Sequence, residues 1–352
     1  MKKINNIFKN IISPENLFAS WEEFKHGKTK KEDVLEFSYN LEGNIFSLAR
    51  DLANKTYRHS NYASFKINDP KPRNIHKATV CDRIVHRALF RILNPIFEPM
   101  FISDSFSCRI GKGHHRGFFR AAEYLRKASS NNTKICLALK CDIRKFFDSV
   151  DHKILKQIIR KKIIDQDVLW LIDGIIDSYF CQSKNILSES GGKDKQICGL
   201  PLGNLTSQLF ANIYLNEFDQ FAKHKLKIKF YARYTDDFIV VSDDQKYLSN
   251  LIQPIKYFLE NNLRLELHPN KVSIRKFSQG VDFLGYVARP CHNLVRIKTK
   301  RRIFRRMQKA AKKLESGLIE EDYYKCLLKS YLGVLSHADA YGLSEKLKMG
   351  DF

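Results

Sequence analysis

Two adjacent carboxylates lie between two apolar runs in this chain, and they constrain the fold more than any other feature. Asp236 and Asp237 separate the run 228–231 from the run 238–241. This pattern predicts a β-hairpin that carries acids at its turn. A polar turn without further function is the competing interpretation, because Asp is common in turns.

A third carboxylate, Asp142, ends the strand-like run 135–141. Neighbouring carboxylates repel each other, and folds tolerate them mainly where a divalent cation relieves the charge. Three acids on rigid strands can hold two Mg²⁺ or Mn²⁺ ions roughly 3.5–4 Å apart for phosphoryl transfer. We expect Asp142 and Asp236 to bridge the ions and Asp237 to assist. Ile143 completes the predicted metal set.

Several segments together resemble reverse transcriptases in their order and spacing. Cys141–Asp148, Gly199–Gln208 and Tyr234–Asp237 resemble motifs A, B and C. Further matches are Leu263–Lys271 to motif D, Phe283–Tyr286 to the primer-grip motif E, and Lys71–Val85 and Ser105–Gly113 to prokaryotic fingers motifs. The resemblance covers about residues 60–350.

The resemblance implies an α+β right-hand polymerase with fingers, a palm built on an antiparallel sheet, and a short helical thumb. We expect a helical extension over residues 1–60, fingers over 61–140, a palm over 141–290 and a thumb over 291–352. A fingers insertion is expected within the palm, at about 152–195. The implied activity is RNA-directed DNA synthesis from dNTPs, with template RNA and RNA:DNA duplex as partners.

Motif B indicates a subtype. Group II intron and retroviral enzymes usually carry Gln after the Pro and a Ser-Pro pair further on, where this chain has Leu202 and Ser207-Gln208. The segment resembles enzymes of diversity-generating retroelements, which implies error-prone copying of a template-repeat RNA, assisted by a small basic accessory protein. Defence-associated and other bacterial retroelement enzymes share parts of the pattern.

A non-catalytic RNA-binding scaffold is the alternative from a different functional class. The acid cluster argues against it, because a binding protein has no reason to retain mutually repulsive carboxylates.

The resemblance also assigns residues to the incoming nucleotide. Arg73, on a predicted basic hairpin over residues 62–75, is expected to bind the triphosphate with support from Lys66 and Lys71, because guanidinium groups bind phosphate bidentately. A solvated basic hairpin is the alternative. Phe147, five positions beyond Asp142, is expected to exclude a 2′-hydroxyl.

Lys271 is expected either to donate a proton to the leaving pyrophosphate or to hold it as a point charge. In motif B, Leu202, Gly203 and Gln208 are assigned to the nucleotide pocket. Asn204 and Ser207 are placed near the template strand, with helix capping as their alternative role.

The net charge of the chain indicates that it binds a polyanionic partner. The chain has 61 Lys and Arg residues against 38 acids, a formal net charge of +23. Such an excess favours nucleic acid through phosphate contacts and counterion release. A basic protein without such a partner is the alternative.

The segment 296–313 contains ten basic residues and no acid. Its apolar residues recur at helical spacing, which predicts an amphipathic basic helix. A membrane surface could bind such a helix, but a thumb that follows the duplex backbone explains it better. Four residues are assigned to nucleic acid: Arg301, Arg302, Arg305 and Arg306.

The eight cysteines form no CxxC pair, so structural zinc is not expected. No run of about 18 apolar residues occurs. We therefore expect a cytoplasmic protein without a membrane partner.

Overall fold

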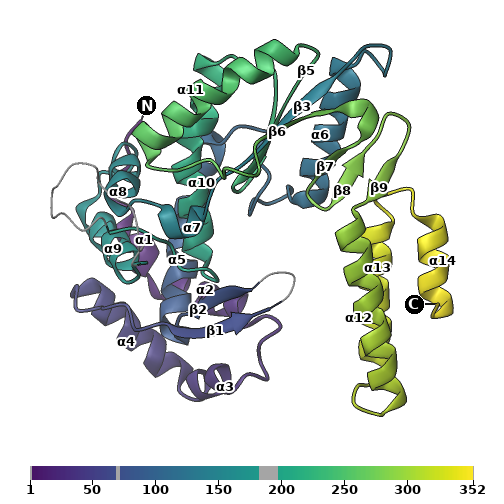
Figure 1. Ribbon diagram of the computed structural model, residues 1–352. Helices are drawn as coiled ribbons and strands as arrows, with labels where there is room; N and C mark the ends of the chain where they lie inside the picture. Colours follow the sequence, from purple (N-terminus) through teal and green to yellow (C-terminus); the bar gives the residue numbers. More distant parts are fainter. Residues whose placement is uncertain (1, 69–71, 182–196, 352) are drawn as a thin grey trace. The chain divides into compact units, whose positions relative to one another are not determined.

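The computed structural model describes residues 2–68, 72–181 and 197–351, which form helices and three antiparallel sheets (Figure 1). The chain divides into two compact units. Unit 1 comprises Met1–Ser103, Ile143–Lys225 and Ile255–Leu267, and unit 2 comprises Asp104–Asp142, Leu226–Pro254 and His268–Phe352. The predicted α+β class is confirmed. The four predicted subdomains remain a prediction, because the contacts define only two units.

Unit 1 is mainly helical. Its elements are α1 (Phe8–Ile12), α2 (Pro14–Lys25), α3 (Glu32–Tyr39), α4 (Leu41–Ala53), β1 (Ala63–Ile67), β2 (Arg73–Lys77), α5 (Val80–Phe97), α7 (Phe146–Ser149), α8 (His152–Arg160), α9 (Gln166–Asp177) and α10 (Leu205–Gln220), with a short 3-10 turn at Glu98–Met100 and a π turn at Phe221–Lys225.

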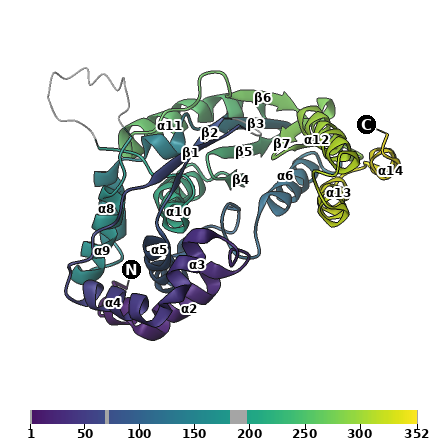
Figure 2. The same cartoon turned by 90° about the horizontal axis from the view of Figure 1, so that it is seen from below.

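Helix α5 is the centre of unit 1. It starts at the N-cap Thr79, whose hydroxyl accepts a hydrogen bond from the backbone N–H of Asp82. Its apolar residues recur every three or four positions, as in Val85, Leu89 and Leu93, and they are buried. Helices α2 and α10 pack against it, and Figure 2 shows α2 and α3 beside α5.

Strands β1 and β2 pair in antiparallel register from Ala63↔Lys77 to Ile67↔Arg73. They form the hairpin that the basic segment predicts. Most of the predicted turn, at residues 69–71, lies outside the described residues. Both strands are largely exposed, so the hairpin presents its side chains to solvent rather than to a core.

Unit 2 contains the two larger sheets. Its elements are α6 (His114–Ala128), β3 (Leu137–Asp142), β4 (Phe230–Tyr234), β5 (Asp237–Ser242), β6 (Ser273–Lys276), a 3-10 turn (Phe277–Gln279), β7 (Val281–Phe283), β8 (Tyr286–Ala288), β9 (Asn293–Val295), α12 (Ile297–Glu315), α13 (Glu321–Leu335) and α14 (Tyr341–Met349). Helix α11 (Gln245–Leu263) begins in unit 2 and ends in unit 1.

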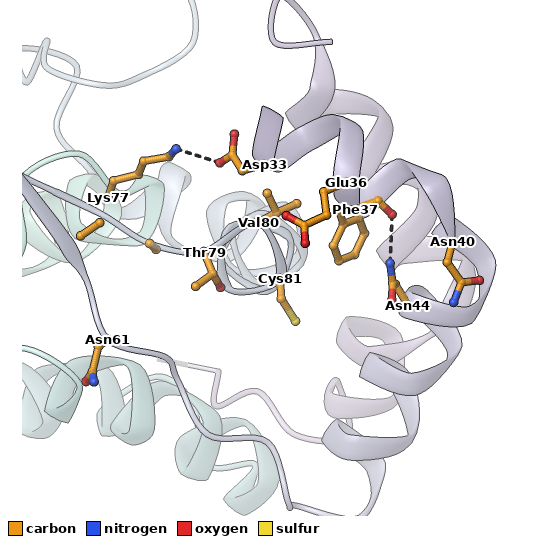
Figure 3. A pocket seen from close by; sticks show the side chains of 12 residues that line it. Asp33, Glu36, Phe37, Asn40, Asn44, Asn61, Lys77, Thr79, Val80 and Cys81 are labelled. Atoms are coloured by element: carbon orange, nitrogen blue, oxygen red, sulfur yellow. Dashed lines mark hydrogen bonds and ion pairs between the residues drawn. The ribbon is translucent and has the colours of Figure 1, made fainter. Parts of the chain in front are cut away.

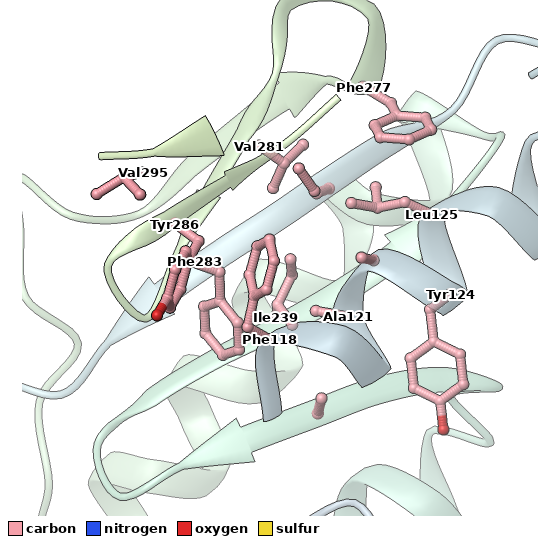
Figure 4. Packing of buried hydrophobic residues seen from close by; sticks show 14 of the residues in the cluster. Phe118, Ala121, Tyr124, Leu125, Ile239, Phe277, Val281, Phe283, Tyr286 and Val295 are labelled. Atoms are coloured by element: carbon pink, nitrogen blue, oxygen red, sulfur yellow. The ribbon is translucent and has the colours of Figure 1, made fainter. Parts of the chain in front are cut away.

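The four-stranded sheet has the order β4-β5-β3-β6. Helix α6 packs against its β4 and β5 strands. Figure 4 shows the core that results, in which Phe118 of α6 lies close to Tyr286 and Ile239. Strands β3 and β5 are nearly continuous apolar runs, so they supply buried side chains to both faces of the sheet, including the face that α6 covers.

The three-stranded sheet β7-β8-β9 leads into the C-terminal helices. Tyr286 joins the two parts, because its hydroxyl donates a hydrogen bond to the carbonyl of Val334 on α13 over 3.0 Å. Helix α13 packs against both α12 and α14. No helix among the described residues is both long and apolar enough to cross a lipid bilayer.

Candidate active site

The β-hairpin predicted around the acid pair is present in unit 2. Strands β4 and β5 pair from Phe230↔Val241 to Tyr234↔Asp237, leaving Thr235 and Asp236 as the connection. On its other side β5 pairs with β3, and this register places Asp142 directly opposite Asp237. Two of the three predicted acids are therefore neighbours across adjacent strands, and the third lies at the turn beside them.

The carboxyl group of Asp237 is held in a repulsive environment. Burial and the neighbouring charges of Asp236 and Asp142 raise the pKa of Asp237 to about 7. In its protonated form Asp237 donates a hydrogen bond to Asp142, which raises this pKa further. Lys140 opposes the shift, and it lies on the same face of β3 as Asp142 because strand residues alternate. Added positive charge, from a proton or a divalent cation, therefore relieves the repulsion in this cluster.

Lys271 lies at the same cluster. Its ammonium group donates a hydrogen bond to Oδ2 of Asp142 over 2.8 Å. The turn that carries Lys271 is fixed by two backbone bonds, from His268 N to the Asp142 carbonyl and from Lys271 N to the His268 carbonyl. In this conformation a lysine neutralises the carboxylate that we predict to bridge the metal ions.

Carboxylate oxygens are suitable ligands for Mg²⁺, and the repulsion between Asp142, Asp236 and Asp237 marks a place where positive charge is favoured. Within residues 2–68, 72–181 and 197–351, however, no three His, Cys, Asp or Glu side chains are arranged to hold a metal ion together. The chemistry of the cluster fits the ion, although this conformation does not assemble the three carboxylates. Ile143 is buried and directly follows the end of β3. Its backbone forms an isolated antiparallel β-bridge with Leu267.

In unit 1, backbone hydrogen bonds bring together three segments assigned to the nucleotide. The N–H of Leu200 donates to the carbonyl of Phe147 over 2.7 Å, and the N–H of His76 donates to the carbonyl of Leu202 over 2.9 Å. Gly203 has a φ of +119°, and a Cβ there would lie 3.1 Å from Cγ2 of Ile75. Glycine therefore permits the close approach of motif B to β2.

The side chains of this region differ in exposure. Phe147 and Leu202 are half-buried, whereas Phe146 is part of the core. Phe146 and Phe147 pack edge to face with centroids 5.3 Å apart. Phe147 thus has one face supported by the core and keeps part of its ring accessible.

Helix α10 begins where motif B predicts. Asn204 is its N-cap, but its side chain makes no capping hydrogen bond, so the capping interpretation is wrong for Asn204. Its Nδ2 atom is buried without a hydrogen-bond partner among the described residues. Ser207 is buried and Gln208 is exposed. Among the motif B residues that the structure describes, Asn204 is therefore a buried hydrogen-bond donor without an acceptor.

The predicted triphosphate residues lie on the exposed hairpin. Arg73 pairs with Ile67 across the strands, and Lys66 pairs with Asn74. Lys71 lies outside the described residues. Arg73 and Lys66 are both exposed, so their charged groups are accessible to an anion.

The basic helix is present as α12. Its predicted apolar stripe is buried at Ile303, Met307 and Ala310. Arg301, Arg305 and Arg306 are exposed and Arg302 is half-buried. Arg306 also donates a hydrogen bond to the Tyr331 hydroxyl over 3.3 Å, so one of the four guanidinium groups has a packing role on α13.

Comparison with known proteins decides the family. A family model described as reverse transcriptase (RNA-dependent DNA polymerase) matches residues 66–288, more than half of the chain. The chain belongs to the reverse transcriptase family. The match contains the acid cluster, both glycines of motif B, the end of β1 and all of β2.

Curated relatives of this reverse transcriptase include intron-associated proteins. The chain is 25% identical to protein YkfC of Escherichia coli (strain K12) over 62% of each chain. It is also 25% identical to the group II intron-encoded protein LtrA of Lactococcus lactis subsp. cremoris, over 63% of this chain and 45% of LtrA. The reverse transcriptase therefore spans less than two thirds of the length of these relatives.

Sequence reasoning missed several residues that contact the predicted site. The motif A segment does not include Lys140, although this residue stands two positions before Asp142 on the same strand face. Arg233, next to Tyr234, is fully buried. Ser105 and Ser107 belong to a segment recognised only as a fingers-type motif. Strand alternation could have indicated Lys140, but the contacts of Arg233 depend on tertiary packing.

A cavity of about 580 Å³ lies elsewhere in unit 1 of the reverse transcriptase, between α3 and the start of α5 (Figure 3). Lys77 and Asp33 at its edge form an ion pair of 2.8 Å. Asn44 donates a hydrogen bond to the carbonyl of Phe37. No described residue of the predicted site lines this cavity.

Proposed function

We propose that this chain is an RNA-directed DNA polymerase that extends a DNA primer on an RNA template. The observation that carries the proposal is the acid cluster of unit 2, in which Asp142 and Asp237 face each other on paired strands beside Asp236. The raised pKa of Asp237 supports it, because a site that disfavours its own negative charge favours a bound cation.

Two Mg²⁺ or Mn²⁺ ions, when bound, would activate the primer 3′-hydroxyl and stabilise the leaving pyrophosphate. Asp142 and Asp236 would be the principal residues that hold the ions, and Asp237 and Ile143 would complete the set. Lys271 would release Asp142 as positive charge arrives and provide a proton or a point charge to the pyrophosphate. Its present contact with Asp142 supports a location close to the reacting phosphates.

The residues of unit 1 would bind the deoxynucleotide. Arg73, Lys66 and Lys71 would bind its triphosphate, and Phe147 would contact its sugar. The remaining assigned residues come from motif B: Leu202, Gly203 and Gln208 at the nascent base pair, and Asn204 and Ser207 at the template. The hydrogen bonds from Leu200 to Phe147 and from His76 to Leu202 support a shared pocket, since they connect these segments directly.

The duplex would be held by the basic face of α12, with residues 291–352 serving as the thumb. The proposed assignment of fingers, palm and N-terminal extension follows the sequence boundaries. We also propose a cytoplasmic location, which suits cysteines that form no disulfide among the described residues.

Asp142→Asn and Asp236→Asn test the chemistry. Each variant should lose Mg²⁺- or Mn²⁺-dependent extension of oligo(dT) on poly(rA) while retaining duplex affinity, because the basic residues are unchanged. Asp243→Asn is the matched control, since Asp243 is exposed beyond the end of β5. Full extension by either site variant would remove that acid from the mechanism. If the parent protein extends no primer, even on its natural RNA, the alternative of a non-catalytic RNA-binding scaffold is favoured.

For the retroelement subtype, we propose a diversity-generating element with a template-repeat RNA and a small basic accessory protein. Leu202 and Ser207-Gln208 in motif B support this assignment. The intron-associated names of the relatives favour a second candidate, an enzyme that copies intron RNA. Sequencing of cDNA distinguishes the two, because errors concentrated opposite template adenine support the first and uniformly low error rates support the second.

A further inference from the structure

Arg233 is a buried cation immediately before the motif C turn. Its side chain has no exposed surface. Burying a guanidinium group is costly unless its donors are used. Two of its donors reach the turn region, with Nη1 donating to the carbonyl of Thr235 and Nη2 to Oγ of Ser105, both over 3.1 Å. The guanidinium therefore joins the turn to a distant part of the chain.

Thr235 adopts a conformation that its side chain disfavours. Its φ is +53°, which is rare for a β-branched residue. Strained backbone of this kind persists only where the surroundings hold it. The Thr235 hydroxyl donates to Oγ of Ser107 over 2.5 Å, and Ser107 also shares a side-chain hydrogen bond with Tyr234. The turn is thus held from two sides.

The segment Asp104–Ser107 lies along the outer edge of β4. The N–H of Arg233 donates to the Asp104 carbonyl and the N–H of Phe106 donates to the Arg233 carbonyl, each over 2.9 Å. These bonds form a short parallel bridge on the edge strand of the sheet. Ser105 and Ser107 therefore adjoin residues that backbone bonds fix to β4.

We propose that Arg233, Ser105 and Ser107 are positioning residues that hold the Thr235–Asp236 turn and thereby set the carboxylate of Asp236 relative to Asp142 and Asp237. None of the three needs to touch substrate. The inference deepens the proposed polymerase function and rests on it for its catalytic consequence. Its structural consequence, a rigid turn, is independent of activity.

Arg233→Met tests this positioning role, because methionine fills the volume of the arginine side chain and removes its hydrogen-bond donors. We expect kcat at saturating dNTP to fall between about tenfold and a hundredfold, since small displacements of reacting groups have effects of this size. The KM for dNTP and the duplex affinity should stay within about twofold, because a positioning role is specific to the chemical step. Arg233→Lys, which keeps the charge but not the fork of donors, should give an intermediate kcat.

Two further readouts do not depend on turnover. Amide hydrogen exchange in peptides spanning 230–238 should be at least about tenfold faster in Arg233→Met, because the turn opens locally more often. The Mn²⁺ concentration that half-saturates the rise in melting temperature should also increase. Tyr124→Phe is the control, since it removes a hydrogen bond to Asp104 without touching the turn.

Ser107→Ala keeps the test decisive if Arg233→Met does not fold, because it leaves Arg233 in place and removes the contacts of one hydroxyl, which include those with Thr235, Tyr234 and Cys108. It should change all readouts in the same direction and less strongly. Unchanged exchange, Mn²⁺ response and kcat in the folded variants would overturn the proposal. A parent protein without polymerase activity would refute the proposed function alone. Hydrogen exchange and Mn²⁺ binding would still test whether Arg233, Ser105 and Ser107 hold the turn.

Discussion

The ammonium group of Lys271 lies 2.8 Å from Oδ2 of Asp142, at the centre of the predicted metal cluster. A cation from the chain therefore occupies the vicinity that divalent ions would share. The two sources of positive charge should compete when no substrate is bound.

We expect Lys271→Gln to bind Mn²⁺ more tightly than the parent, by roughly two- to fivefold, because a partly exposed ion pair contributes up to about 1 kcal/mol. Polymerisation should nevertheless slow, since the proton donor or point charge is lost. Titration of Mn²⁺ against melting temperature measures the affinity. Lys276→Gln, an exposed lysine on β6, is the control. Unchanged or weaker Mn²⁺ binding would show that Lys271 does not compete.

Phe147→Ala should admit ribonucleotides, because loss of the ring opens space where a 2′-hydroxyl would otherwise clash. The measurement is the ratio of kcat/KM for dNTP and rNTP. Phe147→Tyr keeps the ring and should keep the parental ratio. If the Ala variant also discriminates as the parent does, another group contacts the sugar.

Leu202→Gln should lower misincorporation, most visibly opposite template adenine. By resemblance, Gln at this position can hydrogen-bond near the nascent pair, and one such bond is worth about 0.5–1.5 kcal/mol, a several-fold change in discrimination. Leu202→Met, which packs without an amide, should retain the parental error rate. Sequencing of cDNA from one template measures this. Equal adenine error rates in active Gln and parent enzymes would leave Leu202 as a packing residue only.

Charge removal on α12 should reduce the salt dependence of duplex binding. Arg301→Ala/Arg305→Ala should lower the log-log slope by up to about two, and the addition of Arg302→Ala and Arg306→Ala by up to about four. Lys30→Ala/Lys31→Ala removes as much charge as the double variant from exposed residues just before α3. An equal effect of that control would indicate a dependence on net charge instead of on α12.

Stability should fall on mild acidification because His86 is buried as a neutral ring between Thr206 and His59. Burial, followed by the charge of His59, lowers the pKa of His86 from 6.5 to about 3. A folded-state pKa below the unfolded one gives stability that is complete above pH 6.5 and is lost as the pH falls toward 3. At pH 5 the loss attributable to His86 is about 2 kcal/mol.

Urea unfolding at pH 7 and pH 5 measures this dependence. His86→Gln should reduce the pH dependence relative to the parent, because Gln does not titrate. The exposed His26→Gln variant should behave as the parent does. An identical pH dependence in all three proteins would contradict the assignment to His86.

Local patterns in the sequence predict the parts of this site better than their connections. The apolar runs around Asp236 and the run ending at Asp142 predict β4, β5 and β3, because strand character is visible in a few neighbouring residues. The register that places Asp142 opposite Asp237 depends on pairing between distant segments. The burial of Arg233 and the contact of Lys271 with Asp142 arise from the same long-range packing, so no local pattern indicates them.

The bond between His76 and Leu202 has a consequence for how such an enzyme can change over generations. Position 202 is attached to β2 through its carbonyl oxygen, and every amino acid supplies that oxygen. Its side chain can therefore be exchanged by mutation while the attachment persists. A lineage could alter copying accuracy at this position in single steps, each of which leaves a folded enzyme for selection to act on.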